Sequence, residues 1–149
     1  MVNPVAYLVN RAYSVVNQVD YMGVVMTVST RADAPRFEVD AYAFHPLAVP
    51  SRGSKELAIW HLDAAGGAVS PPHHHDREVI FVVTTGRMAA TVGGQQVEAG
   101  PGDAIIVPAE TTFDLRNASA DQPATLTVVS TAGMRATMDG NTFSPPWTI

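Results

Sequence analysis

The chain has 149 residues with a hydrophobic fraction of 46% and a charged fraction of 15%, which predicts one folded domain with a sizeable core. The net charge is −5 and no basic stripe is present, so nucleic acid is excluded as an expected partner. Because there is no cysteine, disulfides, thiolate nucleophiles and cysteine-bound metal centres are excluded as well.

Residues 1–35 are expected to form an N-terminal extension that contains a helix and a strand. Asn3 suits the N-cap and Pro4 the first helical position, and apolar residues between 5 and 19 recur on one helical face. We expect this helix to pack outside the main domain. The sequence has no apolar run long enough to cross a membrane and no signal-peptide pattern, so a cytoplasmic protein is expected.

Short β-like segments separated by turn residues follow from residue 24 onward. Gly93 and Gly94 suit a two-residue hairpin turn, and residues 99–103 form a second strong turn. Regular short strands of this kind predict an all-β sandwich or barrel in residues 36–149. The candidate strands are residues 24–29, 36–44, 56–62, 78–84, 87–92, 95–98, 104–107, 112–116 and 124–129.

Two stretches keep a fixed spacing of glycine, histidine, proline and asparagine. The first contains Gly67, His73, His75, Val79 and Gly86, and the second contains Gly102, Pro108, Glu110, Phe113 and Asn117. These spacings match G-x5-H-x-H-x3-E-x6-G and G-x5-P-x-G-x2-H-x3-N, so residues 56–130 resemble the cupin family. Residues 50–54 and 145–147 more narrowly resemble a group of small single-domain bacterial cupins. The resemblance implies a jelly-roll β-barrel, and the helix expected from residues 3–19 is placed outside it.

In the family, one metal is bound by two histidines and a glutamate of the first motif and a histidine of the second. Carried over residue by residue, His73 and His75 are present, whereas Val79 and Phe113 occupy the other two positions. Two imidazoles make a weak site, because stable sites for first-row metals use three or four protein ligands. We therefore expect no metal cofactor; if a divalent metal is bound, His73 and His75 are its expected ligands.

Neighbouring side chains offer only partial replacements for the missing ligands. Since side chains alternate across a strand, His74 and Glu78 are expected to point away from the interior, unless a bulge turns Glu78 inward. Glu110 is the most plausible substitute, because it is expected in a loop at the mouth of the barrel. His61 is expected on the surface or at an interface, and His45 in a loop without an assigned role.

The expected pocket is apolar and holds two titratable rings. We expect Trp60, Val79, Phe81, Phe113 and Leu115 to bind the substrate, and His73, His75 and Glu110 to be the candidate catalytic residues. Such a pocket predicts metal-independent isomerisation, cyclisation or dehydration of a small hydrophobic metabolite in a biosynthetic pathway.

Two alternatives remain open at the level of sequence. One is a metal-dependent oxygenase or isomerase that uses His73, His75 and a carboxylate, and the other is a non-catalytic protein that binds a small ligand. Ile80 and Val82 are apolar positions on the outward face, which the N-terminal helix or a second subunit would cover. The resemblance to small cupins, which commonly pair, implies a homodimer.

Overall fold

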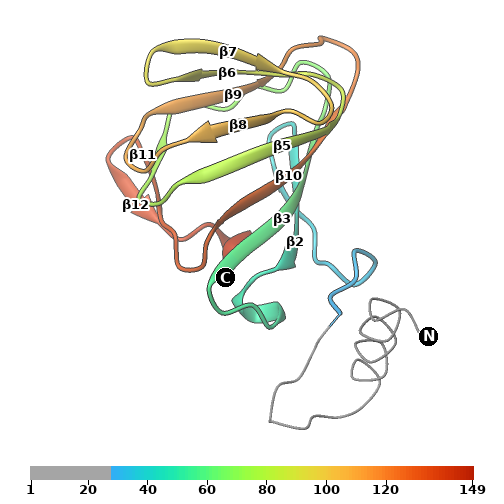
Figure 1. The fold of residues 1–149 in the computed structure, drawn as a ribbon, viewed down its shortest axis with the longest axis vertical. Coiled ribbons are helices and arrows are strands. Elements are labelled where there is room, and N and C mark those ends of the chain that lie inside the picture. Colours follow the sequence, from blue (N-terminus) through green and yellow to red (C-terminus); the bar gives the residue numbers. More distant parts are fainter. Residues whose placement is uncertain (1–27) are drawn as a thin grey trace, which may run out of the picture.

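The computed structural model describes residues 28–149, and almost all of its regular elements are β-strands (Figure 1). The all-β prediction is confirmed, whereas the expected N-terminal helix lies outside the described residues. The elements are β1 Phe37–Val39, β2 Tyr42–Ala48, η1 Pro50–Arg52, β3 Leu57–Ala64, β4 His74–His75, β5 Val79–Thr85, β6 Met88–Val92, β7 Gln95–Ala99, β8 Ala104–Val107, β9 Phe113–Asn117, β10 Ala124–Thr131, β11 Ala136–Met138, β12 Asn141–Phe143 and η2 Pro146–Thr148.

The strands form three antiparallel sheets. The largest has six strands in the order β1-β2-β3-β10-β5-β8, and two three-stranded sheets have the orders β7-β6-β9 and β12-β11-β4 (Figure 1). Buried side chains from all three sheets belong to a single hydrophobic cluster or lie next to it. The sheets therefore enclose one interior.

Side chains alternate strictly between buried and less buried positions in β3 and β10, the two central strands of the large sheet. In β3, Trp60 and Leu62 are buried while His61 between them is half-buried, and in β10, Leu126 and Val128 are fully buried. Each fully buried aliphatic or aromatic side chain contributes about 1.5–3 kcal/mol to folding. A one-residue shift of either strand would move these side chains to the outer face.

Two turns, one before β6 and one after it, require glycine. Gly93 and Gly94 join β6 to β7 with φ of 56° and 83°, which is the left-handed pair that a type I′ hairpin turn requires. Gly86 precedes β6, and a Cβ there would lie 2.7 Å from the side chain of Ala124. A larger residue at position 86 would push β10 away from this turn.

The first half of the large sheet differs from the prediction. Residues 36–44 were expected to be one strand, but Asp40 adopts φ of 51° and the chain turns there from β1 into β2. His45 lies within β2 rather than in a loop. The strands β4, β11 and β12 were not predicted, because they have only two or three residues and no clear alternation.

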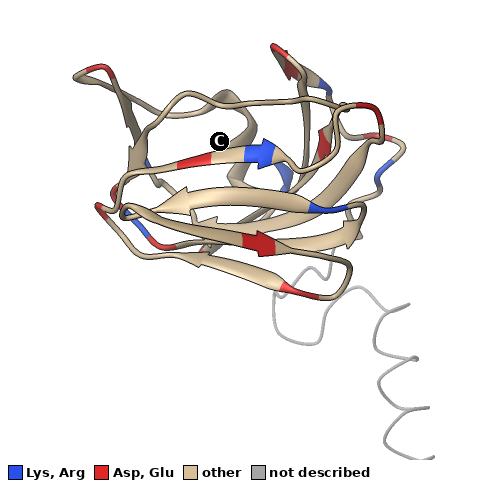
Figure 2. Ribbon diagram, turned by 90° about the horizontal axis from the view of Figure 1, so that it is seen from above, with Lys and Arg blue, Asp and Glu red and all other residues tan. Residues whose placement is uncertain are grey.

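In the described part of the chain, charged residues are scattered over turns and single strand positions and form no basic stripe (Figure 2). Within residues 28–149, no helix is long and apolar enough to cross a membrane.

Candidate functional site

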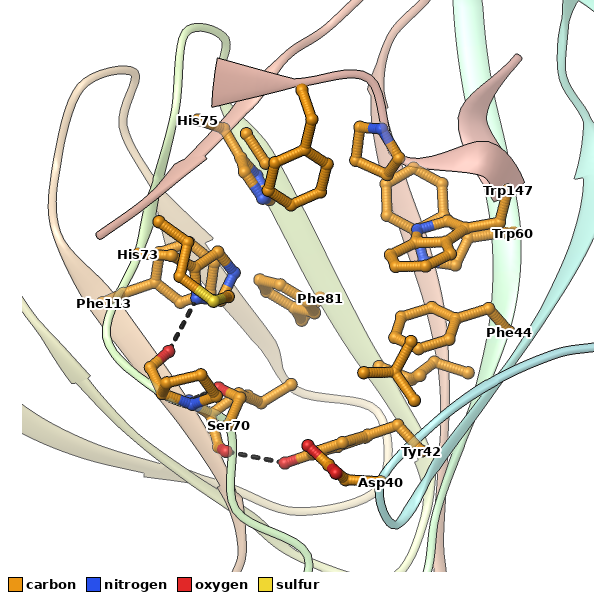
Figure 3. A pocket seen from close by; sticks show the side chains of 18 of the residues that line it. Asp40, Tyr42, Phe44, Trp60, Ser70, His73, His75, Phe81, Phe113 and Trp147 are labelled. Atoms are coloured by element: carbon orange, nitrogen blue, oxygen red, sulfur yellow. Dashed lines mark hydrogen bonds between the residues drawn. The ribbon is translucent and has the colours of Figure 1, made fainter. Parts of the chain in front are cut away.

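A cavity of about 110 Å³ lies between the inner face of the large sheet and strands β4, β9 and β11. Its walls are mostly apolar and rich in aromatic rings, and Phe44 stacks on Trp147 with ring centroids 3.7 Å apart. Figure 3 shows His73, His75 and Phe113 on one wall, with Phe44, Trp60 and Trp147 facing them. The aromatic side chains that line it are Tyr42, Phe44, Trp60, Phe81, Phe113, Phe143 and Trp147.

Backbone pairing fixes the histidine wall. The amide of His73 donates to the carbonyl of Phe113 and the amide of Phe113 donates back, with distances of 3.0 and 2.9 Å. His75 lies two residues further on and pairs with Ala136 of β11. The two imidazole centroids are 5.2 Å apart, and the Phe113 ring lies 4.4 Å from His73 and 5.3 Å from His75.

The tautomer of His73 follows from its hydrogen bond. Its Nδ1 lies 2.8 Å from the carbonyl oxygen of Pro71, which can only accept, so Nδ1 carries the proton (Figure 3). Burial lowers the pKa of His73 below its ordinary value, although the bond to Pro71 opposes this. In the neutral ring, Nε2 is therefore the unprotonated nitrogen.

His75 is more deeply buried than His73 and remains neutral over a wider range. Burial, and then the proximity of His73, lower the pKa of His75 to about 3. Its Nδ1 is buried and makes no hydrogen bond with any described residue, and the same is true of Trp60 Nε1. Both residues line the cavity, so the wall contains two polar groups whose hydrogen-bonding capacity is unused.

The side chains at the four motif positions do not fit a metal ion. Val79 is 0% exposed and Phe113 is 2% exposed, and neither carries a donor atom. Within the described part of the chain, no three histidine or acidic side chains converge on a point where they could hold a metal. The donor set is therefore two imidazoles, one fewer than metal sites in proteins generally use.

The structure places the other candidate residues in different surroundings. Trp60, Phe81 and Leu115 line the cavity, whereas Val79 is buried without reaching it. Glu110 does not line the cavity either. Its side chain is 66% exposed, and its carboxylate lies 3.5 Å from Nε2 of His74, outside the barrel.

Several lining residues were not predicted from the sequence. Tyr42 and Phe44 alternate with Ala43 in β2, and this alternation was present in the sequence as a signal for an inward face. Ser70 lines the cavity from the segment before the histidines. No sequence pattern indicated that Trp147 lines the cavity, because its position depends on the return of the C-terminal segment to the large sheet.

A second histidine pair lies on the outer face of the large sheet. His45 and His61 are direct partners across β2 and β3. Both point Nε2 at Asp63, at 3.0 Å and 2.8 Å from its two carboxylate oxygens. Burial, and then the charge of Arg31, lower the pKa of His45, while its bond to Asp63 opposes the shift.

The sequence of residues 60–130 matches the family model of the cupin domain. This match includes the histidine segment and Phe113, so residues 60–130 form a cupin domain, while β2 and β11, which also line the cavity, lie outside the matched range. Among proteins of curated function, no sequence matches this chain significantly.

Similar solved structures are cupin-fold proteins of diverse activity. The polyketide cyclase RemF from Streptomyces resistomycificus is 21% identical, with a TM-score of 0.63 over 71% of this chain and 79% of that chain. KdgF from Halomonas sp. is 18% identical, with a TM-score of 0.61 over 71% and 93%. Salicylate 1,2-dioxygenase from Pseudoaminobacter salicylatoxidans is 19% identical, with a TM-score of 0.60 over 72% and 31%. These similarities establish the fold alone.

Proposed function

We propose that this chain is an enzyme that moves a proton within a small hydrophobic molecule, in a reaction of the isomerisation, cyclisation or dehydration type. The observation that carries the proposal is the state of His73. Its ring is neutral, its tautomer is fixed by Pro71, and it lines an aromatic cavity beside a second neutral imidazole. A positioned base of this kind suits general acid–base catalysis near neutral pH.

The proposed step uses the two ring nitrogens of His73 in different ways. Nε2 takes a proton from the bound molecule, and the Nδ1–H bond to the Pro71 carbonyl then holds the imidazolium in place. Because burial disfavours the charged ring, the proton is returned readily to another atom of the same molecule. No proton is gained or lost overall. His75 stays neutral throughout and offers a hydrogen bond where charge develops.

We further propose that no resident metal takes part. Two donor-free side chains, Val79 and Phe113, at the remaining motif positions support this. The alternative is a metal on His73 and His75 with Glu78 or Glu110 as a third ligand. Both glutamates are exposed and neither lines the cavity, so no observation favours it. The fold shared with a polyketide cyclase is compatible with cyclisation, but at 21% identity it supports the proposal only at the level of fold.

We also propose that residues 36–149 form a single jelly-roll domain and that the protein is a homodimer. The outer face of the large sheet carries the apolar side chains Ile80, Val82 and Val129, and Ile106 beside them is 58% exposed. A second copy of the chain would cover them. Analytical ultracentrifugation of the purified protein tests this, and a monomer at micromolar concentration would count against it.

The proton-transfer proposal can be tested before the natural substrate is known. 1-Tetralone is a neutral aromatic ketone whose α-protons exchange slowly with solvent. Incubated with the protein in D2O, it should gain deuterium faster than in buffer, as measured by mass spectrometry. His73→Ala should abolish most of the protein-dependent exchange, whereas His61→Ala on the outer face should keep it. Equal exchange with the parent and His73→Ala would contradict the role of His73.

A further inference from the structure

Three hydroxyl or carboxylate side chains gather at the end of the cavity away from His75 (Figure 3). Two of them share one backbone anchor. The hydroxyl of Tyr42 donates to the carbonyl of Leu115 at 2.6 Å, and the hydroxyl of Ser70 accepts from the amide of Leu115 at 2.9 Å. The third is Asp40, in the turn between β1 and β2, which lines the cavity and is exposed.

These bonds leave the Ser70 hydroxyl free to donate a hydrogen bond and the Tyr42 hydroxyl free to accept one. Ser70 uses its oxygen as an acceptor, so its own proton is free to be donated. Tyr42 donates its proton, so its oxygen lone pairs are free to accept. A hydroxyl group placed between the two could accept from Ser70 and donate to Tyr42. Tyr42 stays protonated, since burial and the charge of Asp114 raise its pKa.

The charges around the cavity select against anions. No lysine or arginine is among the described residues that line it, and both histidines are held neutral by burial. Asp40 adds a negative charge at the mouth. An ionised carboxylate or phosphate would therefore lose its hydration without gaining a cationic partner, which is strongly unfavourable.

From this arrangement we infer that Ser70 and Tyr42 form a second polar anchor, and that the substrate is a neutral aromatic molecule with a hydroxyl group directed at this anchor. The inference rests on the proposed function, because it names the substrate class for the same cavity. In size, an apolar cavity of about 150 Å³ holds a benzene-sized ring. The cavity of about 110 Å³ is smaller than this, so at most one ring lies within it and the rest of a substrate extends through the mouth.

The test uses one-ring probes and the two tryptophans as reporters. Trp60 and Trp147 are the only tryptophans in the chain and both line the cavity, so their indole N–H signals in NMR titrations report binding there. The probes are p-cresol, toluene and 4-methylbenzoate, which differ only in the substituent opposite the methyl group. In the parent protein, p-cresol should bind at least about 10-fold more tightly than 4-methylbenzoate. Tighter binding of 4-methylbenzoate would overturn the charge argument.

Two variants test the anchor itself. Ser70→Ala should weaken p-cresol binding about 3-fold to 10-fold and leave toluene binding unchanged, because only p-cresol loses a hydrogen bond. Tyr42→Phe should show the same selectivity, which keeps the test valid if Ser70→Ala disturbs the pairing with Leu115. Ser130→Ala is the matched control, since this buried hydroxyl bonds the carbonyl of Glu78 and does not line the cavity.

The outcomes separate this inference from the proposed function. If both neutral probes shift the tryptophan signals but neither variant discriminates between them, the anchor is wrong while the proton-transfer proposal stands. If neither neutral probe binds, the cavity is not a ligand site, and both the anchor inference and the proton-transfer proposal are contradicted.

Discussion

Two histidine pairs lie on opposite sides of the large sheet. His45 and His61 are on its outer face, and His73 and His75 line the cavity on its inner side, so their surroundings give them different chemistry. His45 and His61 on the outer face share the carboxylate of Asp63, so each Nε2 is occupied by a hydrogen bond. His73 and His75 face an apolar cavity and form no ion pair with any described carboxylate, and Nε2 of His73 makes no hydrogen bond with a described residue. The comparison teaches that a histidine suits proton transfer when its neighbours fix its tautomer but leave one nitrogen available.

The largest expected effect is on turnover. Once a substrate is known, His73→Ala should lower kcat by about 10²- to 10⁴-fold, the usual cost of removing a general base. His75→Ala should lose activity on the same scale or less, because it stabilises charge without moving the proton. His61→Ala should keep near-parental turnover. Circular dichroism should show that each variant is folded. If His73→Ala and His75→Ala both keep near-parental kcat, catalysis depends on the shape of the cavity and not on these histidines.

The next largest effect is a gain of metal binding. Val79→Glu combined with Phe113→His places a donor at each of the two remaining motif positions. Phe113 lies beside both histidines, and glutamate is longer than Val79, which itself does not reach the cavity. Metal bound at 100 times its dissociation constant would stabilise the fold by about 2.7 kcal/mol, so zinc should raise the Tm of the double variant. The parent should hold well under one equivalent of metal, and a chelator should barely change its Tm. Metal analysis that finds no difference between the two proteins would count against this placement of the side chains.

The inner pair should also control how stability depends on pH. The folded-state pKa of His75 is about 3, below the unfolded value of about 6.5, so between these values the unfolded chain binds more protons. Stability should therefore fall as the pH falls from about 6.5 toward 3, with His75 contributing a slope of up to about 1.4 kcal/mol per pH unit. His73 acts in the same direction.

Urea unfolding at several pH values measures this slope. His75→Gln should flatten it, and comparison with the parent isolates His75 because every other group titrates in both proteins. Parallel pH profiles would mean that His75 is not buried as a neutral ring.

Much of the fold could be predicted from the sequence because the signals were local. Alternating apolar residues and glycine-rich turns marked the strands between residues 56 and 131, and the motif spacing indicated which wall carries His73 and His75. Position 45 was misplaced for a physical reason. Pro46 argues against a central strand, but in β2 it lies at a register shift opposite β3, where proline is tolerated.

The parts of the site that were not predicted depend on contacts between distant segments. Trp147 reaches Phe44 only because the C-terminal η2 packs against β2, and nothing local in residues 146–148 indicates it. Glu110 was expected at the mouth from its motif position. Glu110 has φ of 60°, and its side chain lies near His74 and is directed to solvent. No sequence pattern specifies that direction.

The smallest predicted effect concerns the outer pair. Asp63→Ala removes the acceptor of both imidazoles at once and leaves the buried Nε2 of His45 without a partner. Hydrogen bonds to a charged group contribute about 1.5–3 kcal/mol, but Asp63 is about one-third exposed and solvent screens it, so we expect a loss of about 1–2 kcal/mol in the free energy of unfolding. His61→Phe keeps an aromatic ring and should cost less, because the His45–Asp63 bond survives. Turnover should be unchanged in both variants, since neither residue reaches the cavity. A fall in kcat without a fall in stability would show instead that the outer pair is coupled to the inner one through β3, where His61 and Trp60 are adjacent.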